Sequence, residues 1–270
     1  MKKALKYLIL LLLLAACKGN VIDVKEGPDV PEDIPQPGDL KILLIGNSYL
    51  GYNEFPAMFK FFCQAAGKKV FIGHAIVYGQ PLDYHARSGD TYSKIISQKW
   101  DYVILEEGGA VYGYPDTHQY IFPPYIKYDT YNSLKILDNI VKTNNPSAKT
   151  ILFMPWAYED GTTWVPGYSD TYEVMQKKIF DTCMGWAGEL NMIPAPVGWA
   201  FNEVMKTNKQ LHYLYSTDSS HPSQKGSYLM GCVFYKTIFN ESCKGNSYYG
   251  LLSRDEAEYF QKTASELVLE

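Results

Sequence analysis

The residues that could perform chemistry lie in two short segments near opposite ends of the chain. Near the amino end, Ser48 follows an apolar run of strand length over residues 41–45. Near the carboxyl end, Asp218 and His221 stand three residues apart in a loop. A carboxylate that holds an imidazole beside a hydroxyl is the arrangement that activates serine for acyl transfer. The two segments together therefore indicate a serine nucleophile with a histidine base.

The elements around Ser48 determine where its hydroxyl would lie. The apolar run stops at Gly46, and a new helical pattern opens at Asn53. In an open parallel sheet, ligands bind outside the carboxyl ends of the strands, so Ser48 is expected where a substrate would sit. Gly-Asn-Ser alone is an ordinary turn sequence. The interpretation therefore depends on Asp218 and His221 as well.

The two segments resemble the first and last signature blocks of the SGNH (GDSL-like) hydrolases. Gly46-Asn47-Ser48 is similar to the Gly-x-Ser block, and the run from Asp218 to Pro222 is similar to Asp-x-x-His-Pro. The variant with Asn in the first block resembles a Bacteroidetes-type lipoprotein branch, and the resemblance covers about 41–239. It implies that Ser48 is the nucleophile, His221 the base and Asp218 the group that orients the base.

The resemblance also implies an oxyanion hole. Gly79 resembles the glycine of the second block, whose backbone N–H would act together with that of Ser48. The third block normally supplies a side-chain amide, but Glu106 stands at the matching position. An ionised carboxylate ~4 Å from a forming oxyanion would cost ~1 to 4 kcal/mol. Glu106 is therefore protonated, or turned away, or harmful to activity, and Asn47 is the alternative donor.

Alternating patterns over the rest of the chain predict the fold. Strands are expected over 41–45, 69–77, 100–105, 150–154 and 192–196, and helices over 53–67, 131–141, 173–190, 197–206 and 228–239. This alternation predicts a three-layer α/β/α sandwich around a five-stranded parallel sheet. The resemblance to SGNH hydrolases implies that the arrangement is flavodoxin-like. Loops rich in aromatic residues are expected over 112–128 and 160–169 on the active face. His85, Tyr112 and Trp156 are the predicted substrate-binding side chains.

The first 17 residues predict export and lipidation. Lysines precede an apolar run that is too short to span a bilayer, and Leu14-Ala15-Ala16-Cys17 resembles a bacterial lipobox. We expect a lipidated Cys17 and, because Lys18 follows it, anchoring at the outer membrane; a plain signal peptide is the alternative. Prolines over 18–39 predict a tether, and a single domain is expected over 40–270.

Composition narrows the possible partners. The net charge is −4 and no basic cluster interrupts the domain, so a nucleic-acid partner is not expected. No metal-binding motif is recognisable, and neither a metal nor another cofactor is expected. Cysteines at 63, 183, 232 and 243 could form a disulfide or remain buried thiols. Aromatic residues reach 15%, which suits either a surface that stacks on sugars or an aromatic core. The oligomeric state is not predicted.

These observations predict a serine esterase that removes short acyl groups, acetyl above all, from carbohydrate or another small ester. Two alternatives stay open at this point. One is a glycan-binding lipoprotein without catalytic activity, and the other is a hydrolase of the lipase or thioesterase kind with a groove for an acyl chain.

Overall fold

The computed structural model describes residues 34–113, 129–162 and 169–269 of the chain. Cys17, the predicted signal peptide and most of the predicted tether lie outside the described residues. So do residues 114–128 and 163–168, which make up most of the two predicted aromatic loops. The lipid anchor and the domain boundaries therefore stay predictions.

Five strands form one parallel sheet in the order β2-β1-β3-β4-β5. The strands are β1 (Leu40–Gly46), β2 (Val70–Ile76), β3 (Tyr102–Leu105), β4 (Lys149–Phe153) and β5 (Ile193–Ala195). Each lies within the predicted run or within a residue or two of it. The register pairs Ile42 of β1 with Ile72 on one side and Tyr102 on the other. The predicted fold class is confirmed.

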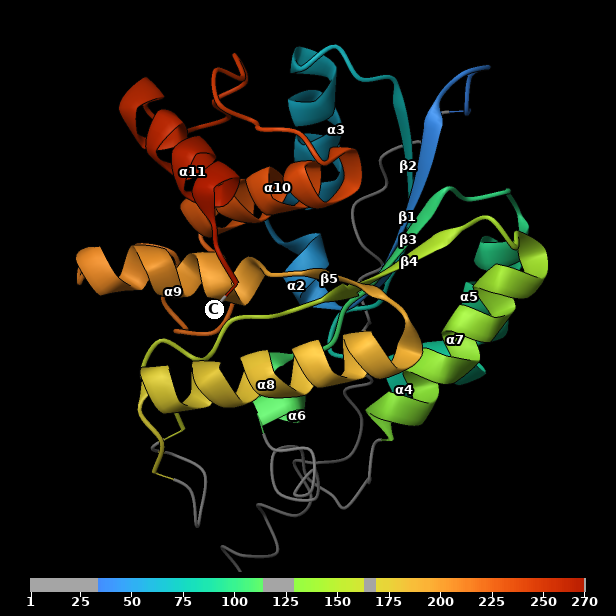
Figure 1. Cartoon of the computed structure of the whole chain (residues 1–270), viewed down its shortest axis with the longest axis horizontal. Coiled ribbons are helices and arrows are strands. Elements are labelled where there is room, and N and C mark those ends of the chain that lie inside the picture. The colour runs from blue at the N-terminus through green and yellow to red at the C-terminus, as the bar shows by residue number, and fades with distance from the viewer. Residues whose placement is uncertain (1–33, 114–128, 163–168, 270) are drawn as a thin grey trace, which may run out of the picture.

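Helices cover both faces of the sheet (Figure 1). One face carries α3 (Phe55–Ala65) and α10 (Gln224–Phe239), and α11 (Arg254–Glu266) packs on α10. The other face carries α4 (Leu82–Arg87), α5 (Gly89–Ile96), α7 (Thr130–Asn144) and α8 (Tyr172–Leu190). The helix α9 (Val197–Thr207) lies between α8 and α10, and α6 (Gly109–Gly113) packs on α8.

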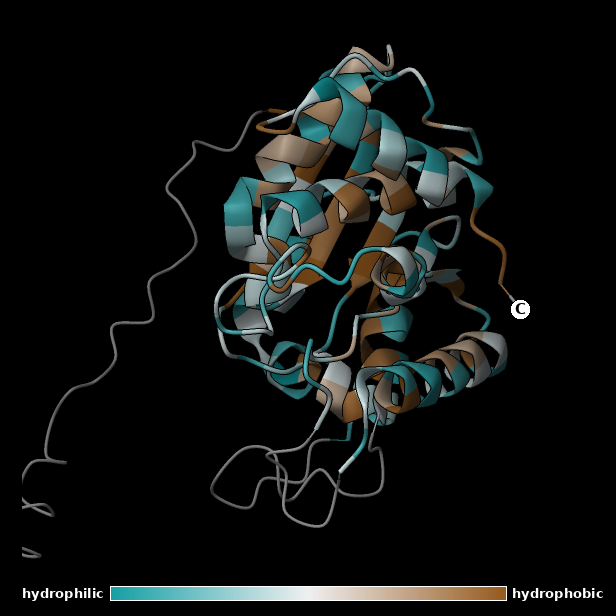
Figure 2. Ribbon diagram, turned by 90° about the vertical axis from the view of Figure 1, so that its left-hand side faces the viewer, coloured by the Kyte–Doolittle hydropathy of each residue, from teal (hydrophilic) through white to brown (hydrophobic). Residues whose placement is uncertain are grey.

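The central strands are buried between these layers (Figure 2). Residues 42–45 of β1 are 0% exposed, which explains why the run is apolar throughout instead of alternating. The largest fully buried side chains are all aromatic, so much of the aromatic content serves the core. Cys63, Cys183, Cys232 and Cys243 are buried free thiols, the second of the two alternatives that the sequence left open.

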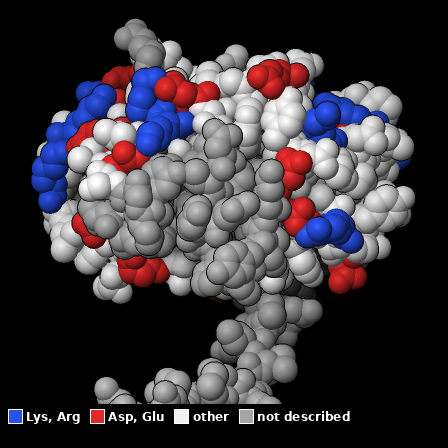
Figure 3. Space-filling view, turned by 90° about the horizontal axis from the view of Figure 1, so that it is seen from below, with Lys and Arg blue, Asp and Glu red and all other residues white. Residues whose placement is uncertain are grey.

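Among the described helices of six or more residues, three were not predicted. Two of them, α4 and α5, are only 6 and 8 residues long, and α5 also contains Gly and Ser, which weaken a helical pattern. The third, α11, does carry a sequence signal, since Ser253 and Glu256 form a capping box before buried residues at 257, 260 and 264. In the described part of the chain, no helix is both long enough and apolar enough to cross a membrane. Lys and Arg side chains share the face shown in Figure 3 with Asp and Glu side chains.

Candidate active site

Ser48 lies in a tight turn between β1 and the short helix α2 (Ser48–Gly51). Asn47 caps this helix, because its side-chain oxygen accepts a hydrogen bond from the Tyr49 amide at 3.0 Å. Asn is among the preferred residues at a helix N-cap. The cap fixes the backbone on both sides of Ser48 at the carboxyl end of the sheet.

His85 supports this turn through the backbone of Gly46. The Gly46 carbonyl accepts a hydrogen bond from His85 Nε2 at 3.0 Å, so Nδ1 carries no hydrogen and accepts from the Thr91 hydroxyl at 2.9 Å. Burial lowers the pKa of His85 to about 4, which keeps the ring neutral. The ring is 1% exposed and does not line the cavity described below. The prediction that His85 contacts substrate is corrected: it positions the turn that carries Ser48.

Glu106 follows β3 and lies under the same turn. Its Oε2 accepts a hydrogen bond from the Asn47 amide at 2.7 Å, and a Cβ at Gly46 would lie only 2.3 Å from this oxygen. Burial raises the pKa of Glu106 well above its ordinary value, although hydrogen bonds from Asn47 oppose the shift. The side chain is 0% exposed and lies outside the cavity lining. Two of the three outcomes that the sequence left open hold together: Glu106 turns away from the cavity, and its raised pKa favours the protonated form.

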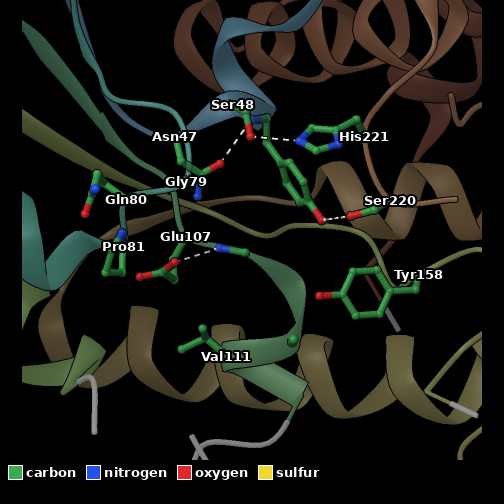
Figure 4. A pocket seen from close by; sticks show the side chains of 13 residues that line it. Asn47, Ser48, Gly79, Gln80, Pro81, Glu107, Val111, Tyr158, Ser220 and His221 are labelled. Atoms are coloured by element: carbon green, nitrogen blue, oxygen red, sulfur yellow. Dashed lines mark hydrogen bonds between the residues drawn. The ribbon is translucent and has the colours of Figure 1, made fainter. Parts of the chain in front are cut away.

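The loop before α10 brings His221 to Ser48 across 173 residues of sequence (Figure 4). His221 Nε2 lies 2.8 Å from Ser48 Oγ, and Nδ1 lies 2.6 Å from Asp218 Oδ2. Because an ionised carboxylate can only accept, Nδ1 carries the hydrogen and Nε2 presents a lone pair to the hydroxyl. This is the tautomer that a general base requires. The three predicted residues are thus joined in one hydrogen-bonded chain.

Asp218 is held in its ionised form. Burial alone would raise the pKa of this carboxyl, but hydrogen bonds from the Ser216 hydroxyl, the amides of His221 and Ser220, and the His221 ring lower the pKa well below its ordinary value. The carboxylate therefore stays charged down to acidic pH. It can orient the imidazole and stabilise a positive charge on it.

A second carboxylate, Glu159, holds the same loop against the body of the protein. Glu159 is 8% exposed and accepts hydrogen bonds from the His212 amide at 2.6 Å, His212 Nδ1 at 2.8 Å and Ser219 Oγ at 3.2 Å. Its own amide donates to the Ser219 carbonyl at 2.9 Å. Side-chain contacts and backbone hydrogen bonds outside the sheet, and not strand pairing in the sheet, therefore determine where Asp218 and His221 lie.

Tyr49 and Trp156 pack together next to the loop that carries His221. The two rings are stacked with centroids 4.8 Å apart, and the Tyr49 hydroxyl lies 2.7 Å from Ser220 Oγ. Trp156 Nε1 donates to the Ser220 carbonyl at 2.8 Å. Trp156 is 0% exposed and lies outside the cavity lining, which corrects its predicted role as a substrate contact. It anchors the residue before His221 instead.

Ser48 and His221 open into a cavity of about 210 Å³. Gly79 lines it and has a φ of +72°, a conformation that glycine adopts without strain. Gly79 therefore lies at the same cavity as Ser48, where the resemblance places an oxyanion donor. The remaining lining is largely apolar or aromatic and includes Pro81, Ala110, Val111 and Tyr158.

Tyr112 is not part of this lining. It lies in α6, is 0% exposed, and its ring centroid is 5.5 Å from that of Trp186 on α8. The predicted loop begins with a helical turn, in which Ala110 and Val111 face the cavity while Tyr112 faces the core. The prediction that Tyr112 contacts substrate is corrected for this reason.

Glu107 is the main residue of the site that the sequence analysis missed. Its carboxyl lines the cavity and accepts hydrogen bonds from the Leu82 amide at 2.8 Å and the Gly108 amide at 3.0 Å. Burial raises the pKa of Glu107 to about 7, and the two amides reduce the shift. The side chain thus ties the segment after Gly79 to the end of β3. Its position at the end of a central strand is the sequence feature that could have identified Glu107 as a residue of the site.

Among the described residues, no group of three or more His, Cys, Asp or Glu side chains is arranged to hold a metal ion. Ser48, His221, Asp218 and Glu107 are all engaged in the hydrogen bonds given above. The arrangement is suited to transfer of a proton between Ser48 and His221.

Comparison with known proteins gives the fold a name. No model of a known protein family matches the sequence, and no curated protein does either. Among solved structures, a DUF4886 family protein from Bacteroides uniformis has a TM-score of 0.68 at 18% identity, covering 84% of this chain and 93% of that chain. A candidate SGNH hydrolase from Slackia heliotrinireducens has a TM-score of 0.58 at 21% identity, covering 74% of this chain and 99% of that one.

An acetylxylan esterase from Geobacillus stearothermophilus has a TM-score of 0.53 at 23% identity, covering 74% of this chain and 94% of that one. At these identities the likeness concerns the fold. The chain has the fold of the SGNH (GDSL-like) hydrolases, as the resemblance of its first and last blocks predicted.

Proposed function

We propose that this protein is a serine esterase of SGNH type that removes short acyl groups, acetyl above all, from carbohydrate. The observation that carries the proposal is the hydrogen-bonded chain from Ser48 through His221 to Asp218, which opens into a cavity. A catalytically inactive glycan-binding protein would have no need of this geometry. The acetylxylan esterase among the structural neighbours supports the choice of substrate class.

The geometry suits two successive acyl transfers. Ser48 Oγ attacks the ester carbonyl while its proton passes to His221 Nε2. The bond to the alcohol breaks, and the alcohol leaves with that proton. Water then gives a proton to the same nitrogen and attacks the acyl-serine, and the acid is released as Ser48 regains its hydrogen. Asp218 stays ionised through both steps and stabilises the imidazolium.

The oxyanion would be held by the backbone N–H groups of Ser48 and Gly79, with Asn47 as a third donor. Asn47 lines the cavity, and its side-chain oxygen is engaged with the Tyr49 amide. The nitrogen of its side-chain amide lies on the side of Gly79 (Figure 4). A neutral donor at this position removes the need for Glu106 to serve in the pocket.

The size of the cavity supports a short acyl group. Pockets for drug-sized ligands typically enclose ~300 to 1,000 Å³, and the cavity here is about 210 Å³. An acetyl group fits such a space, whereas a long acyl chain needs an extended groove. We therefore place lipase-like or thioesterase-like activity second.

We further propose that the enzyme acts in the bacterial cell envelope, held at the outer membrane by lipid on Cys17. The support for this is the lipobox-like sequence before Cys17 and the proline-containing segment that follows it. An anchored enzyme of this kind would meet acylated polysaccharide outside the cytoplasm.

The proposal is tested with p-nitrophenyl esters from acetate to octanoate and with acetylated xylo-oligosaccharides. We expect turnover to be fastest for the acetyl esters and the wild type to be labelled by a fluorophosphonate. Ser48→Ala and His221→Ala should lose both properties at unchanged melting temperature, whereas Ser93→Ala, an exposed serine on α5, should keep them. Full activity in Ser48→Ala, or a preference for octanoate, would contradict the proposal.

A further inference from the structure

The imidazole of His221 lies flat against an aromatic ring. The Tyr52 ring is stacked on it with centroids 4.1 Å apart and an interplanar angle of 11°. The Tyr49 ring meets the same imidazole edge-on, with centroids 5.4 Å apart at 81°. Tyr52 thus covers one face of the base while both of its nitrogens stay engaged with Ser48 and Asp218.

The segment that carries Tyr52 is held in a strained conformation next to the His221 loop. Tyr52 begins the 3₁₀ turn η1 (Tyr52–Glu54), in which Asn53 and Glu54 have φ values of 58° and 51°. Non-glycine residues seldom adopt this region, and such strain is frequently found at functional sites. Asn53 Nδ2 donates to the Pro222 carbonyl at 2.9 Å, directly after His221. The strained turn and the base are therefore tied together.

We propose that Tyr52 is a positioning residue for the base: its ring fixes the plane of the His221 imidazole and stabilises the imidazolium formed when Ser48 gives up its proton. This rests on the proposed esterase function. The face of an aromatic ring is electron-rich and attracts a cation stacked on it, the more so when water is excluded. The positive charge on His221 is then shared between the Asp218 carboxylate at Nδ1 and the Tyr52 face.

Few other groups near His221 can change charge. Asp218 faces Nδ1 from the same loop and stays ionised. From α2, Ser48 faces Nε2, and Tyr49 stays neutral because burial raises its pKa well above the ordinary value. Glu107 and His221 line the same cavity, and the Tyr52 substitutions leave Glu107 unchanged. A substitution of Tyr52 therefore changes the ring against the imidazole and leaves these charges in place.

The test compares the full chain with Tyr52→Phe and Tyr52→Leu. The ring signals of His221 are followed by NMR as pH is varied and are assigned by their loss in His221→Gln. Tyr52→Leu should lower the titration midpoint by ~0.5 to 1 pH unit, because the imidazolium loses the aromatic face. Tyr52→Phe keeps the ring and should titrate like the wild type. A Leu variant that is folded but titrates at the wild-type midpoint would overturn the proposal.

Activity gives a second readout. In kcat/KM for an acetyl ester, the acid limb of Tyr52→Leu should move to lower pH by the same amount, and the plateau of kcat should fall ~3- to 10-fold at similar KM. A ring that only fills space would lower the melting temperature without moving the limb. If Leu does not fold, Tyr52→Met takes its place as the variant without a ring. The NMR titration needs no turnover. If the wild type had no esterase activity, the proposed function would be refuted, and the titration would still decide the role of Tyr52.

Discussion

The two sides of the cavity are built in different ways. On the strand side, Ser48 and Glu107 follow β1 and β3 directly, so the sheet places their backbone. On the loop side, Asp218 and His221 lie outside the sheet and depend on side-chain contacts such as those of Glu159. The difference suggests where the site is sensitive. On the strand side, substitutions should act on the chemistry itself, and on the loop side they should act by displacing the base.

The largest effect is expected on the strand side, at Asn47. Asn47→Ser keeps an oxygen that can cap α2 and removes the amide nitrogen proposed as an oxyanion donor. We expect kcat for an acetyl ester to fall ~10²-fold at nearly unchanged melting temperature, because one positioned donor is typically worth this much.

Asn47→Ala is the matched variant, since it removes the cap as well. It should show the same loss of rate together with a loss of ~1 kcal/mol in the free energy of unfolding. Stopped-flow or steady-state kinetics alongside thermal melts would separate the two roles. An Asn47→Ser enzyme as fast as the wild type would exclude Asn47 as the third donor.

A smaller effect is expected on the loop side, at Glu159. The Glu159 carboxylate accepts three hydrogen bonds from His212 and Ser219, and Gln has a single oxygen for these donors. Glu159→Gln should lower the free energy of unfolding by ~1 to 3 kcal/mol, because a buried donor loses its acceptor. It should also lower kcat by ~10-fold with little change in KM, because the base is displaced.

Glu203→Gln is the control for this prediction. Glu203 pairs with Lys206 at the surface, and such pairs typically contribute less than ~1 kcal/mol. Its kinetics and melting temperature should match the wild type. If Glu159→Gln lost stability but kept its full kcat, the Glu159 contacts would support the fold without positioning His221.

The same contrast explains which parts of the site could be predicted from the sequence. The strand side follows from local pattern: an apolar run, a glycine and a serine are enough to place Ser48 at the end of β1. The loop side was predicted only because Asp218 and His221 resemble a known block. Its supports, Glu159 and Tyr49, are brought to the loop by contacts across 53 to 171 residues, and no local pattern records these contacts.

Side-chain direction was the other limit. Glu106 and Glu107 are neighbours at the end of β3, and successive residues of an extended chain point to opposite sides. One of them lies under the turn at Gly46 while the other lines the cavity. The sequence analysis singled out Glu106 and missed Glu107, because which of the two carboxyls faces the cavity depends on how β3 is placed against β1.

The smallest effect on rate, and a distinct effect on stability, is expected from these two carboxyls. The pKa of Glu107 is about 7 in the folded protein against an ordinary 4.5, so the folded state binds more protons than the unfolded state between these pH values. The free energy of unfolding therefore falls as pH rises from 4.5 to 7, by ~3 kcal/mol at ~1.4 kcal/mol per pKa unit. His85 has the opposite sign, because its pKa is lowered from 6.5 to about 4 and its contribution is lost as pH falls through that range.

In the wild type these two slopes oppose each other between pH 4.5 and 6.5. Glu107→Gln removes one of them, so the free energy of unfolding should rise with pH across this range more steeply than in the wild type.

Glu106→Gln should shift the pH dependence in the same direction, over a window that extends to higher pH, because burial keeps Glu106 protonated well above its ordinary range. The kcat/KM of this variant at neutral pH should stay close to that of the wild type, since Gln is a neutral substitute that can accept a hydrogen bond from the Asn47 backbone amide. Urea unfolding at several pH values measures all three proteins. A Glu106→Gln variant with much faster turnover would show that the Glu106 carboxylate reaches the oxyanion. It would contradict the assignment of Glu106 as the buried carboxyl and Glu107 as the one that faces the cavity.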